Sequence, residues 1–239
     1  HVGILLVVFN FLLAPLKRYK AARFLKIFIL LVLLWGFAVI AGLSPSVVRA
    51  VTMFSFLAIG LHINRRTSSI NSLFLSLMLL LLINPRWIFE VGFQLSYLAV
   101  LAILLLQPLL YQLYTPSGRA GKYFWGLLST TIAAQAGVLP LSLFYFHQFP
   151  GLFFLSNLVI LPVLGFILIC GIMVILLAVS GFLPEWMALG YARLIEILNF
   201  FVSGVAQKEH FIFRDISFSL PQVWFFYLAL LALVLVWMS

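Results

Sequence analysis

The chain carries a few polar side chains inside long apolar runs, and these residues could do chemistry. The first is Arg49, which lies one turn into the apolar run 47–61, after a polar hinge at 42–46. A guanidinium at membrane depth costs about 3 to 17 kcal/mol unless something compensates its charge. Compensation can come from a lipid headgroup, a carboxylate or carbonyl, a wet cavity or a passing polyanion. The partner of Arg49 therefore bears directly on function.

Amide and hydroxyl groups form a second set of candidates. Gln94 and Tyr97 are three residues apart in one apolar run, so we expect them to share a helix face, with Ser96 beside them. Gln135 stands in a patch of small residues, where helix backbones can approach closely, and Asn157 follows in the next run. Such groups either bond a neighbouring helix or line a hydrated path, and both interpretations stay open.

Three prolines mark expected hinges or helix breaks: Pro45 before the run of Arg49, Pro140 after the small-residue patch, and Pro162 after Asn157. Interrupted spans can mark a midplane site of the kind that transporters use. Alternatively, these prolines are kinks whose freed carbonyls are satisfied by neighbouring helices.

Enzyme constellations are missing from the sequence. It contains no nucleophile elbow, zinc-binding helix pair or phosphate-cradling glycine loop. His147 is expected to cap a span at the outer interface, and His1 is similarly isolated, so we expect no metal. The single Cys170 excludes a disulfide within the chain. We expect neither catalysis nor a cofactor.

Composition sets the class of protein. The chain is 65% hydrophobic and 8% charged, against roughly 25% charged residues in soluble domains. Several runs are long enough to cross a hydrocarbon core about 30 Å thick. We predict an all-α, polytopic membrane bundle with about eight spanning helices and one amphipathic or laterally inserted helix, forming one domain over 1–239. Because the chain opens at His1 without a charged leader, we expect no signal peptide and the membrane part of a longer protein.

Charge orients the predicted spans, which cover 2–16, 27–41, 47–61, 70–83, 91–110, 123–146, 151–179 and 223–239. The predicted loops 17–26, 62–69 and 112–122 carry five, two and two basic residues and no acid. Basic loops stay in the cytoplasm. The pattern therefore predicts a cytoplasmic (inner) membrane protein with His1 outside.

Segment 185–206 differs from the other runs. Its polar residues are Glu185 and then, every three or four positions, Arg193, Glu196, Asn199 and Ser203. A helix with one polar stripe lies in the interface or faces a wet interior. We favour a laterally inserted or bundle-facing helix over a span, which would return the C-terminus to the side of His1.

An ordered set of motifs resembles the competence domain of ComEC proteins. The run Gly42-Leu43-Ser44-Pro45-Ser46-Val47-Val48-Arg49-Ala50 is similar to that family's G-x-S-P-S-x-x-R-A, and Gly92 to Val100 is similar to its G-F-Q-L-S-F-x-A-V. Tyr97 stands where Phe is usual, and Asn84 where Asp is frequent. Further matches follow in the family's order: His1-Val2, Asn84-Pro85, Ala134-Gln135, Leu139-Pro140-Leu141, Phe146-His147, Asn157 and Pro162.

The resemblance implies an inner-membrane channel that passes one DNA strand into the cytoplasm during natural transformation. It implies as partners single-stranded DNA, the lipid bilayer, flanking domains of the same chain and other competence proteins, such as a DNA receptor and a cytoplasmic motor. The path candidates are Arg49, Ser46, Gln94, Ser96, Gln135, Asn157, His1 and His147. In this hypothesis Arg49 offsets phosphate charge; alternatively it snorkels to outer headgroups. A transporter for a smaller anionic solute and a membrane anchor for a nuclease domain remain the other function classes.

Overall fold

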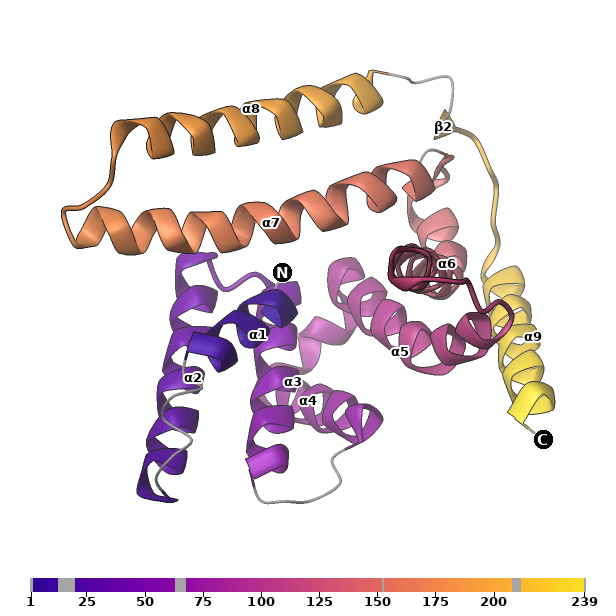
Figure 1. Cartoon of the computed structure of the whole chain (residues 1–239). Coiled ribbons are helices and arrows are strands. Elements are labelled where there is room, and N and C mark those ends of the chain that lie inside the picture. The colour runs from indigo at the N-terminus through magenta and orange to yellow at the C-terminus, as the bar shows by residue number, and fades with distance from the viewer. Residues whose placement is uncertain (1, 13–19, 63–67, 152, 208–211, 239) are drawn as a thin grey trace. The chain divides into compact units, whose positions relative to one another are not determined.

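The computed structural model describes residues 2–12, 20–62, 68–151, 153–207 and 212–238 (Figure 1). Within them lie nine α-helices, one 3₁₀ helix and a two-stranded sheet. The chain divides into two compact units, His1–Leu106 and Gln107–Ser239. In chain order the elements are α1 Val2–Leu12, α2 Lys20–Ile40, α3 Pro45–His62, α4 Ser69–Ile83, η2 Pro85–Phe89, α5 Val91–Gln112, α6 Arg119–Phe146, β1 Phe149–Pro150, α7 Phe153–Val179, α8 Glu185–Ala206, β2 Ile212–Phe213 and α9 Leu220–Met238.

The structure confirms an all-α membrane bundle. Among the described residues, five helices are long and apolar enough to cross a membrane, with windows at 91–112, 119–146, 156–179, 185–205 and 220–237. Three shorter apolar helices cover 25–40, 45–60 and 69–83. Many large apolar side chains are exposed, including Leu82, Phe200 and Val236. Apolar side chains are stable on the outer surface of a folded chain when the surrounding medium is the hydrocarbon of a membrane.

The first unit packs around two apolar clusters. One joins α1, α2 and α3 through Val2, Leu34 and Val51. The other joins α3, α4 and α5, and its buried members are Val48, Leu73, Leu80, Phe93 and Tyr97. The connections from α2 to α3 and from α4 to α5 lie within the described residues, and their local chemistry is readable in the sequence.

In the connection from α2 to α3, a glycine follows the end of α2 and a proline begins α3. Gly42 has φ of 76°, and the Leu43 N–H bonds the Ala38 carbonyl at 2.9 Å, as at many helix C-termini. Pro45 then opens α3, where a missing N–H is harmless. Next along the chain, Asn84 Oδ1 accepts a hydrogen bond from the Arg86 N–H at 3.1 Å, and Pro85 starts η2. Asn84, Pro85 and Arg86 thus form the turn that begins η2.

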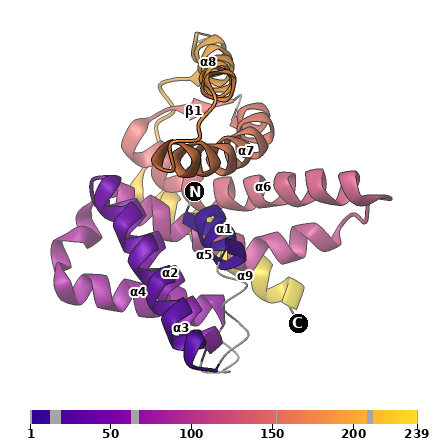
Figure 2. The same cartoon turned by 60° about the vertical axis from the view of Figure 1, so that its left-hand side comes forward.

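In the second unit, α6 contacts both α7 and α9, and α7 contacts α8. Helices α7 and α8 lie side by side in both views (Figures 1 and 2). The strands β1 and β2 pair antiparallel, Phe149 with Phe213 and Pro150 with Ile212. The Ile216 N–H also bonds the His147 carbonyl at 3.1 Å. We call this pairing and hydrogen bond the clasp.

Several predicted boundaries were wrong, for physical reasons. Lys20, Arg23 and Lys26 belong to α2 instead of a loop, and Arg119 and Lys122 lie in the first turn of α6. Arg119 and Lys122 are exposed, and such basic side chains can extend a span because their long stems stay in apolar surroundings while the charges reach water. Helix α9 begins at Leu220, three residues before the predicted start at 223. Its first turn is fixed by Ser219, whose N–H and Oγ both donate to Gln222 Oε1, at 2.7 and 2.9 Å. This S-x-x-Q pattern resembles a capping box.

The expected breaks at Pro140 and Pro162 are absent, because α6 and α7 are continuous through both residues. A third proline, Pro108, lies inside α5. Near Pro140, the Tyr227 hydroxyl of α9 donates to the Gly137 carbonyl at 2.9 Å. Pro140 lacks the N–H that would bond the Ala136 carbonyl, so the Tyr227 hydrogen bond lies beside the interrupted turn of α6 and ties α9 to it.

Candidate functional site

The candidate site is built around Arg49, on the second turn of α3. The Ser44 carbonyl accepts hydrogen bonds from the N–H groups of Val47 and Val48, both at 2.9 Å, which fixes the start of the helix. Val48, the residue before Arg49, is buried in the cluster of α3, α4 and α5. The Arg49 guanidinium reaches the same cluster, where it lies over the ring of Tyr97.

The guanidinium contacts α5. Arg49 Nη1 donates a hydrogen bond to the Ser96 carbonyl, and its Cζ lies 5.6 Å from the centroid of the Tyr97 ring. The first contact satisfies one N–H group, and the second is a cation–π interaction. Of the partners expected for this arginine, a carbonyl is the one that it contacts among the described residues, and that carbonyl belongs to α5.

Tyr97 is itself held by α4. Its hydroxyl lies 3.0 Å from Ser76 Oγ, and its ring lies 4.7 Å from that of Phe93. Ser76 Oγ also donates to the Leu73 carbonyl at 2.7 Å. Both Ser76 and Tyr97 are buried. Arg49, Tyr97 and Ser76 therefore form a polar chain that joins α3, α5 and α4; we call it the arginine cluster.

The arginine cluster leaves its positive charge in place. Within the described part of the chain, the guanidinium's recorded partners are a carbonyl and a phenol ring, which are uncharged at neutral pH. Arg49 Nε is buried and makes no hydrogen bond to any described residue. These contacts orient the cation without neutralising it.

The other candidates of the first unit have local roles. Gln94 Nε2 donates to the Ile88 carbonyl of η2 at 2.7 Å, so its amide turns back toward the preceding element. Ser96 contributes its main-chain carbonyl to Arg49, a contact that side-chain type could not reveal. Ser46 is exposed in the first turn of α3. Ser76 was missed, although its four-residue spacing from Ser72 in an apolar run was a usable signal.

In the second unit, Gln135 and Asn157 are half-buried on α6 and α7. His147 ends α6 as predicted: its φ is 56°, and its N–H bonds the Leu143 carbonyl at 3.0 Å. His1 lies outside the described residues. That all these side chains line one passage stays a prediction.

Taken by fold and site, this is a polytopic α-helical membrane protein with an arginine held inside its first helical unit. Comparison with known proteins then gives the family. A family model described as "Competence protein" matches residues 1–239, so the chain belongs to the competence protein family. The family expected from the ordered motifs is confirmed.

One curated relative is similar over most of the chain. "ComE operon protein 3" of Bacillus subtilis (strain 168) is 30% identical over 215 residues, which cover 88% of this chain and 26% of the relative. The chain thus spans about a quarter of the length of that relative. No solved structure matches.

Proposed function

We propose that this chain forms the membrane passage through which single-stranded DNA enters the cytoplasm during natural transformation. Membership of the competence protein family supports this function over transport of a smaller anionic solute. The helices long enough to span a membrane support the setting, since a polyanion crosses a hydrocarbon layer only through a protein.

The observation that carries the proposal is the unneutralised charge of the arginine cluster. Channels for a single strand combine spaced positive charge with aromatic faces. The contacts to Ser96 and Tyr97 hold the guanidinium in a defined orientation while leaving its charge available to phosphate. One oriented cation attracts a passing phosphate without the dense contacts that would trap the strand.

The proposed setting follows from the charge pattern. The protein lies in the cytoplasmic membrane, with the basic residues of segments 17–26, 62–69 and 112–122 toward the cytoplasm and His1 outside. Its partners are then a DNA receptor outside, a motor in the cytoplasm and flanking domains of the same polypeptide. The chain itself carries no catalytic role; it conducts.

The test is transformation frequency in cells whose own copy of the gene carries a substitution. Arg49→Gln removes the charge, and the Ser96 carbonyl keeps its place in the hydrogen-bond ladder of α5. Arg86→Gln is the matched control, since Arg86 is exposed on η2. With equal protein levels in the membrane, the proposal expects a loss of about tenfold or more for Arg49→Gln alone, given the energy of one charge-assisted phosphate contact. Unchanged transformation in Arg49→Gln would refute a role for this charge.

A further inference from the structure

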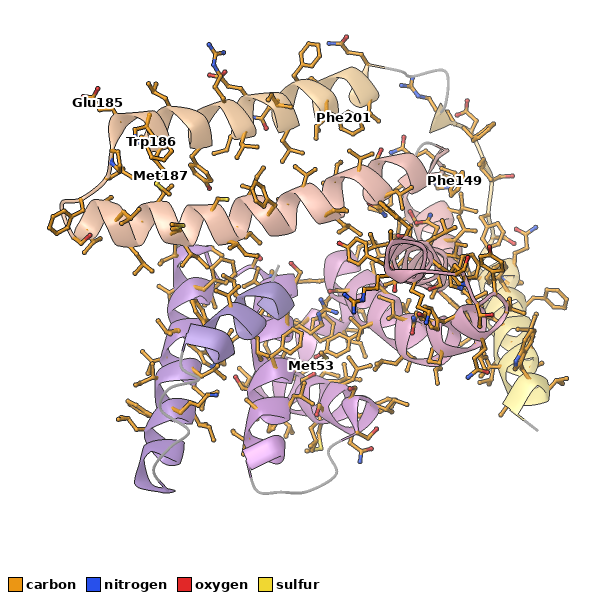
Figure 3. The ribbon with its side chains drawn as sticks, viewed as in Figure 1. Met53, Phe149, Glu185, Trp186, Met187 and Phe201 are labelled. Atoms are coloured by element: carbon orange, nitrogen blue, oxygen red, sulfur yellow. The ribbon has the colours of Figure 1, made fainter. Side chains whose placement is uncertain are left out.

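Helices α7 and α8 form an antiparallel hairpin in which one face of α8 packs on α7. The less exposed residues of α8 recur every three or four positions: Met187, Tyr191, Leu194, Leu198, Phe201 and Val205. Figure 3 shows Met187 and Phe201 between the two helices, with Glu185 on the outer side. Packing is close, because a Cβ at Gly171 of α7 would lie 2.5 Å from the Tyr191 hydroxyl.

The clasp ties both ends of this hairpin to one place. β1 ends three residues before α7 begins, and β2 follows α8 after a short connection. Because β1 pairs with β2, the chain leaves the clasp along α7 and returns to it along α8 (Figure 1). Helix α8 must therefore span about the same distance as α7, in the opposite direction, to return to the clasp.

The first limb is a membrane span. Residues 153–179 contain no charged side chain, and the window 156–179 is the most hydropathic of the candidate spans. At 1.5 Å per residue, α7 is about 40 Å long, more than the hydrocarbon core of about 30 Å. The 22 residues of α8 reach about 33 Å, which is enough to cross back.

The outer face of α8 carries a row of polar residues, beside the exposed apolar side chains of Leu189 and Phe200. Glu185, Arg193, Glu196, Asn199 and Ser203 are all exposed and occur on the side away from the residues that face α7. Arg193 Nη1 and Glu196 Oε2 pair at 2.8 Å, and their side chains remain 80% and 62% exposed. These two residues lie near the middle of the helix. If α8 crosses the membrane, these two residues lie near the bilayer centre, where contact between a charged side chain and lipid is energetically costly.

We propose that α8 crosses the membrane as the return limb of α7, and that its polar stripe faces water inside the membrane. This inference goes beyond the proposed function and does not depend on it. It replaces the sequence-based preference for a laterally inserted or bundle-facing helix over a span, which rested on the polar stripe alone. It also places the two ends of α8 on opposite sides of the membrane.

Thiol labelling tests the inference in the full-length protein, in a Cys170→Ser background. Glu185→Cys and Gln207→Cys report the two ends of α8. Asn199→Cys and Ser203→Cys report the stripe without disturbing the ion pair, and Ile197→Cys is the matched control at similar depth. Labelling uses a membrane-impermeant thiol reagent applied to intact cells or to inverted vesicles. A permeant reagent on denatured protein gives the total.

The proposal expects positions 185 and 207 to label from opposite sides. It also expects Asn199→Cys and Ser203→Cys to label at least about tenfold faster than Ile197→Cys, because the reactive thiolate forms in water and not in lipid. Labelling of both ends from one side would overturn the crossing. Equal rates at stripe and control positions would overturn the hydrated face and indicate cover by lipid or by another protein segment. If Asn199→Cys fails to accumulate, Ser203→Cys decides the second point.

Discussion

The Tyr97 hydroxyl lies 3.0 Å from Ser76 Oγ, across the interface of α5 and α4 and 21 residues away in sequence. The Tyr97 ring at the same time faces the Arg49 guanidinium. A buried serine on α4 thus helps to fix the aromatic face beneath the cation on α3. This relationship makes the effects of two small substitutions unequal.

Ser76→Ala is expected to destabilise the protein more than Tyr97→Phe. Removing Ser76 Oγ leaves the buried Tyr97 hydroxyl without this partner, which costs about 1 to 3 kcal/mol. Removing the Tyr97 hydroxyl leaves Ser76 Oγ its bond to the Leu73 carbonyl, so the loss is about 1 kcal/mol or less. Thermal unfolding in detergent measures both. The double variant should be no less stable than Ser76→Ala; additive losses would show that the two groups do not interact.

The Tyr97 ring should matter more for DNA uptake than its hydroxyl. Tyr97→Phe keeps an aromatic face for Arg49, whereas Tyr97→Leu removes a cation–π contact of about 0.5 to 2 kcal/mol. We expect transformation within about twofold of wild type for Phe, and a loss of several-fold for Leu. Equal uptake in both variants, at equal protein levels, would count against orientation of Arg49 by the ring.

A designed clash tests the α7–α8 contact. Gly171→Ala places a methyl group 2.5 Å from the Tyr191 hydroxyl, so folded yield should fall. Adding Tyr191→Phe removes the nearest atom and leaves Tyr191 Cζ as the next, at 3.2 Å from the new Cβ. The double variant should recover part of the yield. Gly190→Ala is the control, because a Cβ there meets no atom within 4 Å. No recovery in the double variant would contradict the packing described.

Tyr227→Phe tests how α9 attaches to α6. It removes a hydrogen bond to the Gly137 carbonyl, and such bonds in membranes contribute about 0.6 kcal/mol on average and up to about 1.7 kcal/mol. A matching loss in unfolding free energy is expected, whereas Tyr123→Phe, at an exposed position on α6, should change it little. Equal effects of the two substitutions would indicate that the Tyr227 bond contributes nothing specific.

Much of the helical framework follows from hydropathy. The amphipathic segment 185–206 coincides with α8, and the predicted starts of α1 and α5 and ends of α6 and α7 agree with the structure. The turns at Gly42 and Asn84 depend only on residues that are neighbours in sequence, so their chemistry is readable from the sequence. Arg49 was recognisable because one charge in an apolar run needs an explanation wherever it points.

Helix faces were less predictable. In a membrane helix, apolar residues cover both the lipid-facing and the packed sides, so periodicity does not show which side meets which neighbour. The contact from Arg49 to the Ser96 carbonyl spans 47 residues, and that from Tyr227 to Gly137 spans 90. The clasp joins two strands of two residues each, too short to leave an alternating pattern. Without it, nothing in segment 185–206 showed that α8 returns beside α7.

Strand passage through purified protein tests the central claim most directly. The full-length protein is reconstituted into lipid vesicles that enclose a nucleic-acid dye, and a short single-stranded oligonucleotide is added outside. We predict a dye signal with wild type and with Arg86→Gln, and a signal reduced about tenfold with Arg49→Gln, as loss of one charged phosphate contact implies. A neutral oligosaccharide of similar size, trapped and assayed separately, controls for leaks. No passage of the strand through wild-type vesicles, or equal passage through the Arg49→Gln protein, would contradict the account.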